Sequence, residues 1–217
     1  MNLYLVRHGA STWNEQNRIQ GSKNPPLSPL GQRQAERLAA RLKAEKISLI
    51  YASDLLRSKR TAQIIQKVLR VPLRYEKGLR EINLGVWEGK TPDEVDRAYP
   101  QRYQKWRKTP SRVRIPGAEP VRIFRRRVLA TFKTLLSHVP EGNLLVVCHG
   151  GVICTLLANL LKGSEDRFLL RLRLDNTGLS LAKLNDRRDG IVWYVNDTSH
   201  LKGLIKPQDA RIRVKTF

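Results

Sequence analysis

The amino-acid sequence predicts an α/β fold, with a mostly parallel central sheet and helices on both of its faces. Short, mostly apolar runs at residues 3–6, 47–51 and 144–147 are typical of strands that are buried on both faces. Longer segments with the period of amphipathic helices lie between these runs. Because parallel strands are joined by helical crossovers, this alternation favours one α/β domain over residues 1–217.

Helix-start residues place the first helices. Ser28 is suited to an N-cap and Pro29 to the first helical position. The apolar stripe of the helix that they begin is formed by Ala35, Leu38, Ala39 and Leu42. We expect Ser53 to cap a second helix, and a third short strand to lie at residues 71–75.

The stretch from about residue 88 to 120 departs from this rhythm, and we predict a small helical insertion there. Residues 91–94 read Thr-Pro-Asp-Glu, which is a capping box followed by a polar helical stretch to about residue 106. The remaining elements are predicted from apolar patterns: a loop at 110–120, helices at 121–139 and 152–161, and closing strands at 168–174, 178–184 and 191–195.

The composition indicates a basic protein without membrane spans. Lys and Arg number 41 against 19 Asp and Glu, which gives a formal net charge of +22. The basic residues are scattered without interleaved aromatics, so we favour a solvated basic surface over a specific nucleic-acid role. No secretory signal or long apolar run is present, and we expect a cytoplasmic protein with no membrane partner. Cys148 and Cys154 form no CxxC pair, so we expect two buried thiols and no zinc site.

Two predicted strands end in His-Gly, at His8-Gly9 and at His149-Gly150. In α/β sheets, ligands bind at the carboxyl ends of the strands, so we expect both imidazoles to meet in one pocket. Gly150 also precedes a predicted helix, and the N-terminus of a helix is suited to binding an anion.

The neighbouring residues indicate chemistry at phosphorus. A guanidinium such as Arg7 matches phosphate oxygens, and a neutral imidazole such as His8 is a competent nucleophile. Phosphoryl transfer needs positive charge around the phosphate, which Arg7, Arg57 and a protonated His149 are expected to supply. Glu81 is the candidate acid, with a pKa that a nearby phosphate would raise.

Four motifs carry a resemblance to a known family. Residues 5–14, LVRHGASTWN, resemble the signature of the histidine phosphatase superfamily, in the branch that contains cofactor-dependent phosphoglycerate mutase. The motifs at 53–58, 79–82 and 147–150 follow in the family's order, and they read SDLLRS, LREI and VCHG. The resemblance covers nearly the whole chain.

The resemblance implies a phosphoglycerate mutase-like fold, with no metal and no cofactor, and it implies roles for individual residues. His8 resembles the nucleophile that becomes phosphohistidine, and Glu81 resembles the proton donor. Arg7, Arg57 and His149 resemble the phosphate pocket, to which Gly150 adds the helix start. The positions that line the family's substrate site are Asn14, Gln20 and Gly21. Two substrate-facing loops depart from the family, at Asn24 and at residues 117–120.

The resemblance favours a phosphomonoester hydrolase that acts on a small phosphorylated metabolite. Residues 83–89, NLGVWEG, are similar to the broad-specificity and alpha-ribazole phosphatases of the family rather than to its mutases. We expect the predicted insertion to roof an open apolar pocket with Val95, Tyr99, Tyr103 and Trp106.

Two alternatives stay open: a cofactor-dependent phosphoglycerate mutase, and a non-catalytic basic protein that binds anions or nucleic acid on the same fold. The oligomeric state is also open, with a homodimer among the choices. Other phosphatase classes are disfavoured, because the chain has neither a Cys-to-Arg signature loop, nor a DxD motif at its acidic residues, nor a P-loop.

Overall fold

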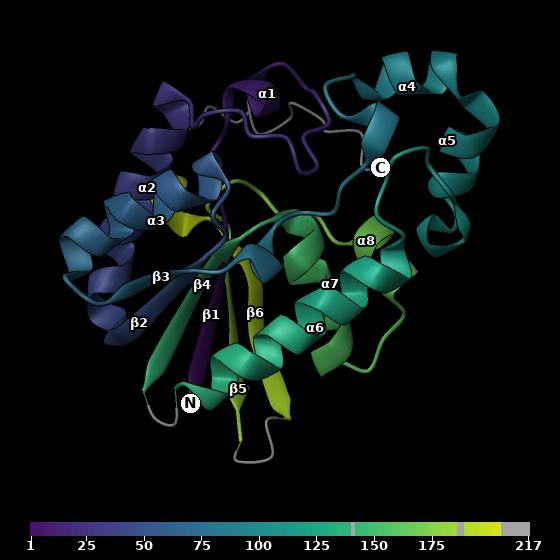
Figure 1. Cartoon of the computed structure of the whole chain (residues 1–217). Helices are drawn as coiled ribbons and strands as arrows, with labels where there is room; N and C mark the ends of the chain where they lie inside the picture. The colour runs from purple at the N-terminus through teal and green to yellow at the C-terminus, as the bar shows by residue number, and fades with distance from the viewer. Residues whose placement is uncertain (140–141, 186–188, 205–217) are drawn as a thin grey trace.

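The computed structural model describes residues 1–139, 142–185 and 189–204. Within them the strands form one six-stranded sheet of order β3-β2-β4-β1-β5-β6 (Figure 1). The strand bounds are β1 (Asn2–Arg7), β2 (Ile47–Ala52), β3 (Leu73–Tyr75), β4 (Asn143–Cys148), β5 (Leu179–Leu184) and β6 (Gly190–Asp197). β1, β2, β3 and β4 pair in parallel, whereas β5 is antiparallel to both β1 and β6. The predicted α/β class with a mostly parallel sheet is confirmed.

Helices cover both faces of this sheet, as its side-chain alternation requires. In β1, Tyr4 and Val6 pack with α2 (Pro29–Leu42) and α3 (Leu56–Leu69) on one face. On the other face, Leu3 and Leu5 pack with α6 (Val121–Ser137) and α7 (Gly150–Leu160). Because consecutive residues of a strand point to opposite faces, one apolar strand serves two cores.

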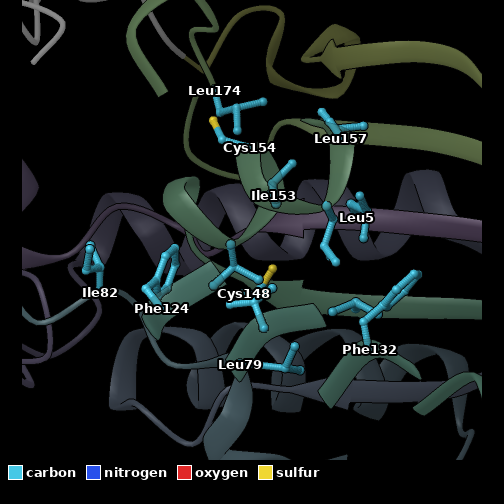
Figure 2. Close-up of a cluster of buried hydrophobic side chains, with 14 of the residues drawn as sticks. Leu5, Leu79, Ile82, Phe124, Phe132, Cys148, Ile153, Cys154, Leu157 and Leu174 are labelled. Carbon is cyan, nitrogen blue, oxygen red and sulfur yellow. The ribbon is translucent and has the colours of Figure 1, made fainter. Parts of the chain in front are cut away.

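Figure 2 shows part of the cluster on the α6 and α7 face. Leu5 of β1 and Phe132 of α6 belong to this cluster, together with Ile153 of α7. Cys148 and Cys154 lie in the same cluster and are buried free thiols, as predicted. Burial raises the pKa of Cys154 to about 12, which makes it a poor nucleophile at neutral pH.

Shorter helices surround the carboxyl ends of the strands. They are α1 (Thr12–Glu15), α4 (Pro92–Ala98), α5 (Pro100–Trp106) and α8 (Glu165–Arg171). Single turns of 3₁₀ helix occur at Lys43–Glu45, Lys77–Leu79, Gly85–Trp87, Pro110–Arg112 and Ser199–Leu201. Figure 1 shows α1, α4 and α5 above the strand ends, away from the two helical layers.

The segment that contains α4 and α5 has a small apolar cluster of its own. The capping box at Thr91 and Glu94 forms as predicted. Trp87 is fully buried, and its ring meets Tyr103 and Trp106 edge to face at centroid distances of 5.8 and 5.6 Å. Of the side chains predicted to roof an open pocket, Val95, Tyr103 and Trp106 are instead buried in the core, whereas Tyr99 is half-buried.

Two further predictions of secondary structure are wrong. Residues 168–174 were expected to form a strand, but α8 spans Glu165–Arg171 and packs on α7. Its acidic first turn favours a helix, and the apolar spacing of Phe168, Leu169 and Leu172 also suits one face of a helix. Ser53 does not cap α3, whose N-cap is Leu55.

α2 packs closely against the segment after β1, so one methyl group added at Gly31 should lower the stability of the protein. A Cβ added at Gly31 would lie 2.0 Å from the carbonyl oxygen of Ala10. We expect Gly31→Ala to lower the free energy of unfolding by about 2 kcal/mol or more, because backbone must move to make room. Arg33→Ala, an exposed site on the same helix, should change it by less than about 0.5 kcal/mol. Equal denaturation midpoints for the two variants would contradict this interpretation.

Candidate active site

The parallel pairing of β1 with β4 brings the two predicted histidines together. Arg7 is paired with Cys148 in the register, so His8 and His149 leave the sheet side by side at its carboxyl edge. Their ring centroids are 5.1 Å apart, and both residues are almost completely buried. The predicted convergence of the imidazoles is what the structure shows.

The hydrogen bonds of His8 fix its tautomer. Nδ1 lies 2.7 Å from the carbonyl oxygen of Gly9, which can only accept, so Nδ1 carries the proton. Nε2 therefore has a lone pair, and it accepts from Nε of Arg57 at 3.1 Å. Burial lowers the pKa of His8 well below 6.5, and the charges of Arg57 and Arg7 lower it further. The imidazole is therefore neutral at pH 7, and its lone pair lies on Nε2.

Arg57 is a buried cation near the start of α3. Its side chain donates to the carbonyl oxygens of Lys23 at 2.7 Å and Gly21 at 2.8 Å, besides its bond to His8. Burial lowers the pKa of Arg57 to about 10, so the guanidinium stays charged at neutral pH. Thr61 links Arg57 to the His8 strand, because its hydroxyl donates to the Arg57 carbonyl and accepts from Gly9 N–H.

The charge of the His149 imidazole differs from the prediction. Its Nε2 lies 2.9 Å from Oγ of Ser53, and its Nδ1 is buried without a partner among the described residues. Burial lowers the pKa of His149 well below 6.5, and the nearby charges of Arg57 and Arg7 add to this effect. We expected a protonated His149, but these surroundings favour the neutral imidazole.

Glu81 lies in the loop before α4, and its side chain extends toward the start of α7, where His149 lies. Its Oε2 accepts from Gly151 N–H in the first turn of α7, and its Oε1 accepts from Ile82 N–H, both at 3.0 Å. A Cβ at Gly151 would lie 2.4 Å from Oε1, so glycine leaves room for the carboxylate. The carboxylate thus lies at the helix start that His149 and Gly150 begin.

Two arginines hold the chain that carries Glu81. Arg80 donates to both carboxylate oxygens of Asp54, at 2.7 and 2.6 Å, and these bonds hold the pKa of Asp54 below its usual value. Arg127 of α6 donates to the carbonyls of Gly78 and Arg80, and pairs with Glu119. The sequence did not predict this role for Arg127, because nothing in the pattern of a basic helix distinguishes the arginine that turns inward.

Arg7 lies at the end of β1 and donates to the carbonyl oxygen of Leu174. Burial lowers the pKa of Arg7, while the charges of Glu81 and Asp175 raise it. The interaction with Glu81 shows that this guanidinium belongs to the same cluster of charges. The five predicted residues His8, Arg7, Arg57, Glu81 and His149 therefore lie together.

The predicted substrate-lining residues form the neighbouring loop. Oδ1 of Asn14 and Oε1 of Gln20 both accept from Ser11, which orients the two amides. Gly21 has a φ of +51°, and a Cβ there would lie 2.0 Å from Oε1 of Glu88. Asn176, in the loop before β5, donates from Nδ2 to the His8 carbonyl at 2.9 Å.

The two loops that depart from the family have structural contacts, at Asn24 itself and at Glu119, which matches the family and lies between the departing Ala118 and Pro120. Asn24 accepts from Leu56 N–H at 2.6 Å, which supplies α3 with the side-chain cap that Leu55 lacks. Glu119 forms a bidentate ion pair with Arg127. Both side chains support the elements that carry Arg57 and Glu81.

Two kinds of feature are absent from the described residues. Across 1–139, 142–185 and 189–204, no group of three or more His, Cys, Asp or Glu side chains is arranged to hold a metal ion. In the same part of the chain, no helix is long and apolar enough to cross a membrane.

Comparisons with known proteins identify the family. The pattern described as histidine phosphatase superfamily (branch 1) matches residues 3–197, and the chain belongs to this family. It is 38% identical over 186 residues to a protein of Photorhabdus laumondii named "Probable phosphoglycerate mutase GpmB", with 83% of each chain covered.

Solved structures of the family have the same fold. The YhfR protein of Bacillus stearothermophilus superposes with a TM-score of 0.86 at 30% identity, covering 92% of this chain and 98% of its own. A mycobacterial glucosyl-3-phosphoglycerate phosphatase in complex with VO3 superposes with a TM-score of 0.81 at 27% identity, covering 90% and 97%.

The two buried imidazoles predict how stability depends on pH. Their pKa values are lowered in the folded protein, so below about pH 6.5 the unfolded chain binds protons that the folded chain does not. The free energy of unfolding should fall between about pH 6.5 and pH 5.5, by up to about 1.4 kcal/mol per histidine. Urea denaturation at several pH values measures this loss, which His8→Asn should reduce. Stability that does not change over this interval would mean that the two imidazoles bind protons as readily in the folded protein as in the unfolded chain.

Proposed function

We propose that this protein hydrolyses phosphomonoesters of a small metabolite through a phosphohistidine at His8. The observation that carries the proposal is the state of His8: Nδ1 donates to Gly9, which leaves the Nε2 lone pair directed toward the buried Arg57. A neutral imidazole beside fixed cations suits in-line attack on a phosphate dianion.

In the first step, Nε2 of His8 attacks phosphorus and the P–O bond to the leaving group breaks. Arg7, Arg57 and His149 bind the equatorial oxygens, and Nε of Arg57 moves from His8 to a phosphate oxygen. Glu81 gives its proton to the departing oxygen. In the second step, Glu81 takes a proton from water, which attacks phosphorus and releases phosphate with neutral His8 restored.

The charges of the site support this sequence of steps without a metal ion. Two guanidiniums and the first turn of α7 provide the positive potential that the transferred group requires. The substrate-binding groups are those of Asn14, Gln20, Gly21 and Gly150. We propose that residues 1–217 act as one cytoplasmic domain, with residues 88–120 as a helical insertion beside the site.

A phosphoglycerate mutase is the second candidate, because a relative that is 38% identical carries that name. A mutase needs contacts that keep water from the phosphohistidine until the substrate has turned over. The motif at 83–89 favours hydrolysis, because it resembles the phosphatases of the family.

The two candidates differ in the fate of the phosphoryl group. With 3-phosphoglycerate and a trace of 2,3-bisphosphoglycerate, we expect free phosphate to form with little 2-phosphoglycerate. With ³²P-labelled substrate, acid-labile label should appear on the peptide that contains His8, and His8→Ala should lose both label and turnover. Rapid isomerisation without phosphate release would make this protein a mutase.

The reaction should continue after chelator treatment, because the proposed steps use no metal ion. Loss of activity that only Mg²⁺ restores would refute metal independence.

The acid role of Glu81 is tested by changing the leaving group. Glu81→Gln should be about 100-fold slower on an alkyl phosphate, whose leaving oxygen needs a proton, and much less impaired on p-nitrophenyl phosphate. Glu88→Gln is a control, since Glu88 binds Ser22 and Leu84 N–H groups rather than the α7 start. Equal losses of kcat/KM on both substrates would remove Glu81 from this role.

A further inference from the structure

Ser53 makes a buried contact with His149 that the proposed mechanism has not used. It follows the last residue of β2, is fully buried, and donates its backbone N–H to the carbonyl of Val147 at 3.0 Å. These constraints hold its Oγ at 2.9 Å from Nε2 of His149. The contact joins β2 to the residue that begins α7.

The hydrogen-bonding capacity of Ser53 determines which group donates. Its Oγ already accepts from Leu55 N–H at 3.4 Å, a long bond. Within the described residues, the only partner recorded that can accept the Ser53 hydroxyl proton is Nε2 of His149. If Nε2 donated instead, a buried hydroxyl proton would be left without an acceptor, which costs free energy.

The other ring nitrogen of His149 supports the same assignment. When Nε2 accepts from Ser53, the single proton of the neutral ring must lie on Nδ1. Nδ1 is the buried atom without a partner in the described part of the chain. An N–H there is a donor that a phosphate oxygen can satisfy, whereas a bare lone pair would repel that oxygen.

We propose that Ser53 is a positioning residue that holds His149 as its Nδ1–H tautomer and so presents Nδ1 to a phosphate oxygen. The phosphate ligand in this inference rests on the proposed function, whereas the tautomer rests only on the hydrogen bonds of Ser53 and His149. His149 then contributes a neutral N–H donor instead of a positive charge, and the fixed charge comes from Arg7 and Arg57. The Ser53 hydroxyl also opposes protonation of Nε2, which keeps His149 neutral when an anion binds.

The tautomer can be measured directly by ¹⁵N NMR on the whole protein with labelled histidines. We expect the His149 signals, assigned with His149→Asn, to show a protonated Nδ1 and an unprotonated Nε2. This measurement needs neither substrate nor turnover. A protonated Nε2 beside a bare Nδ1 in the wild-type protein would overturn the proposal, even if no Ser53 variant folds.

The variants test whether Ser53 is the cause. Ser53→Ala should bind inorganic phosphate about tenfold more weakly and show a mixture of His149 tautomers, because one charge-assisted bond is no longer preorganised. Ser53→Thr keeps the hydroxyl and should retain the wild-type NMR pattern. The matched control is Ser58→Ala, which removes another fully buried hydroxyl that donates to Val147 O at 2.7 Å. It should leave both phosphate affinity and the His149 signals unchanged.

The outcomes separate this inference from the proposed function. Wild-type tautomer and phosphate affinity in Ser53→Ala would refute the role of Ser53, while ³²P label on His8 would still support hydrolysis through phosphohistidine. Absence of that label, with the expected tautomer, would refute the proposed function and leave the Ser53 contact in place.

Discussion

The site depends on the buried guanidinium of Arg57, which forms no salt bridge with a carboxylate of the described residues. Arg57 donates to the carbonyls of Gly21 and Lys23 and to Nε2 of His8. Burying a charge is costly unless hydrogen bonds replace its hydration, and these three bonds do so. They also bring three separate parts of the chain together: the strand end at His8, the loop at 21–23 and the start of α3. Because carbonyl dipoles only partly neutralise the cation, the pocket keeps a positive potential for a phosphate dianion.

That positive potential explains the protonation of the neighbouring groups. Burial and the two guanidiniums lower the pKa of both His8 and His149, so neither imidazole adds to the charge. A nucleophilic His8 has to be neutral, and burial together with the cations that are proposed to bind phosphate keeps it so. Glu81 is held beside them by the N–H groups of Ile82 and Gly151. One arrangement of charges therefore suits the proposed phosphate binding, the proposed nucleophile and the proposed acid.

The sequence could predict those parts of the structure that local patterns and strand order determine. The apolar strands, the helix starts at Ser28 and Thr91, and the meeting of His8 with His149 follow from periodicity and from parallel pairing. Contacts between distant residues could not be predicted, and they include the bond of Ser53 to His149 and the inward turn of Arg127. Ser53 was expected to be a helix cap because its local sequence suits that role equally well. The same locality explains the error at residues 168–174, where an apolar run fits both a strand and α8.

The positions of the proposed site residues within the fold also bear on whether the phosphoryl group is hydrolysed or transferred. Every group that touches the proposed phosphoryl site comes from a strand end or from the start of α3 or α7, apart from Glu81 and the loop at 14–21. Residues 83–120 instead pack around Trp87 and connect to the site through Glu88, which binds Ser22 and Leu84, and through Glu119, which pairs with Arg127. Phosphorus chemistry can therefore stay the same while this segment changes. Its apolar cluster is closed on itself and contains none of the proposed catalytic residues. The residues proposed for phosphoryl transfer and the segment whose motif favours hydrolysis are thus separate parts of the chain.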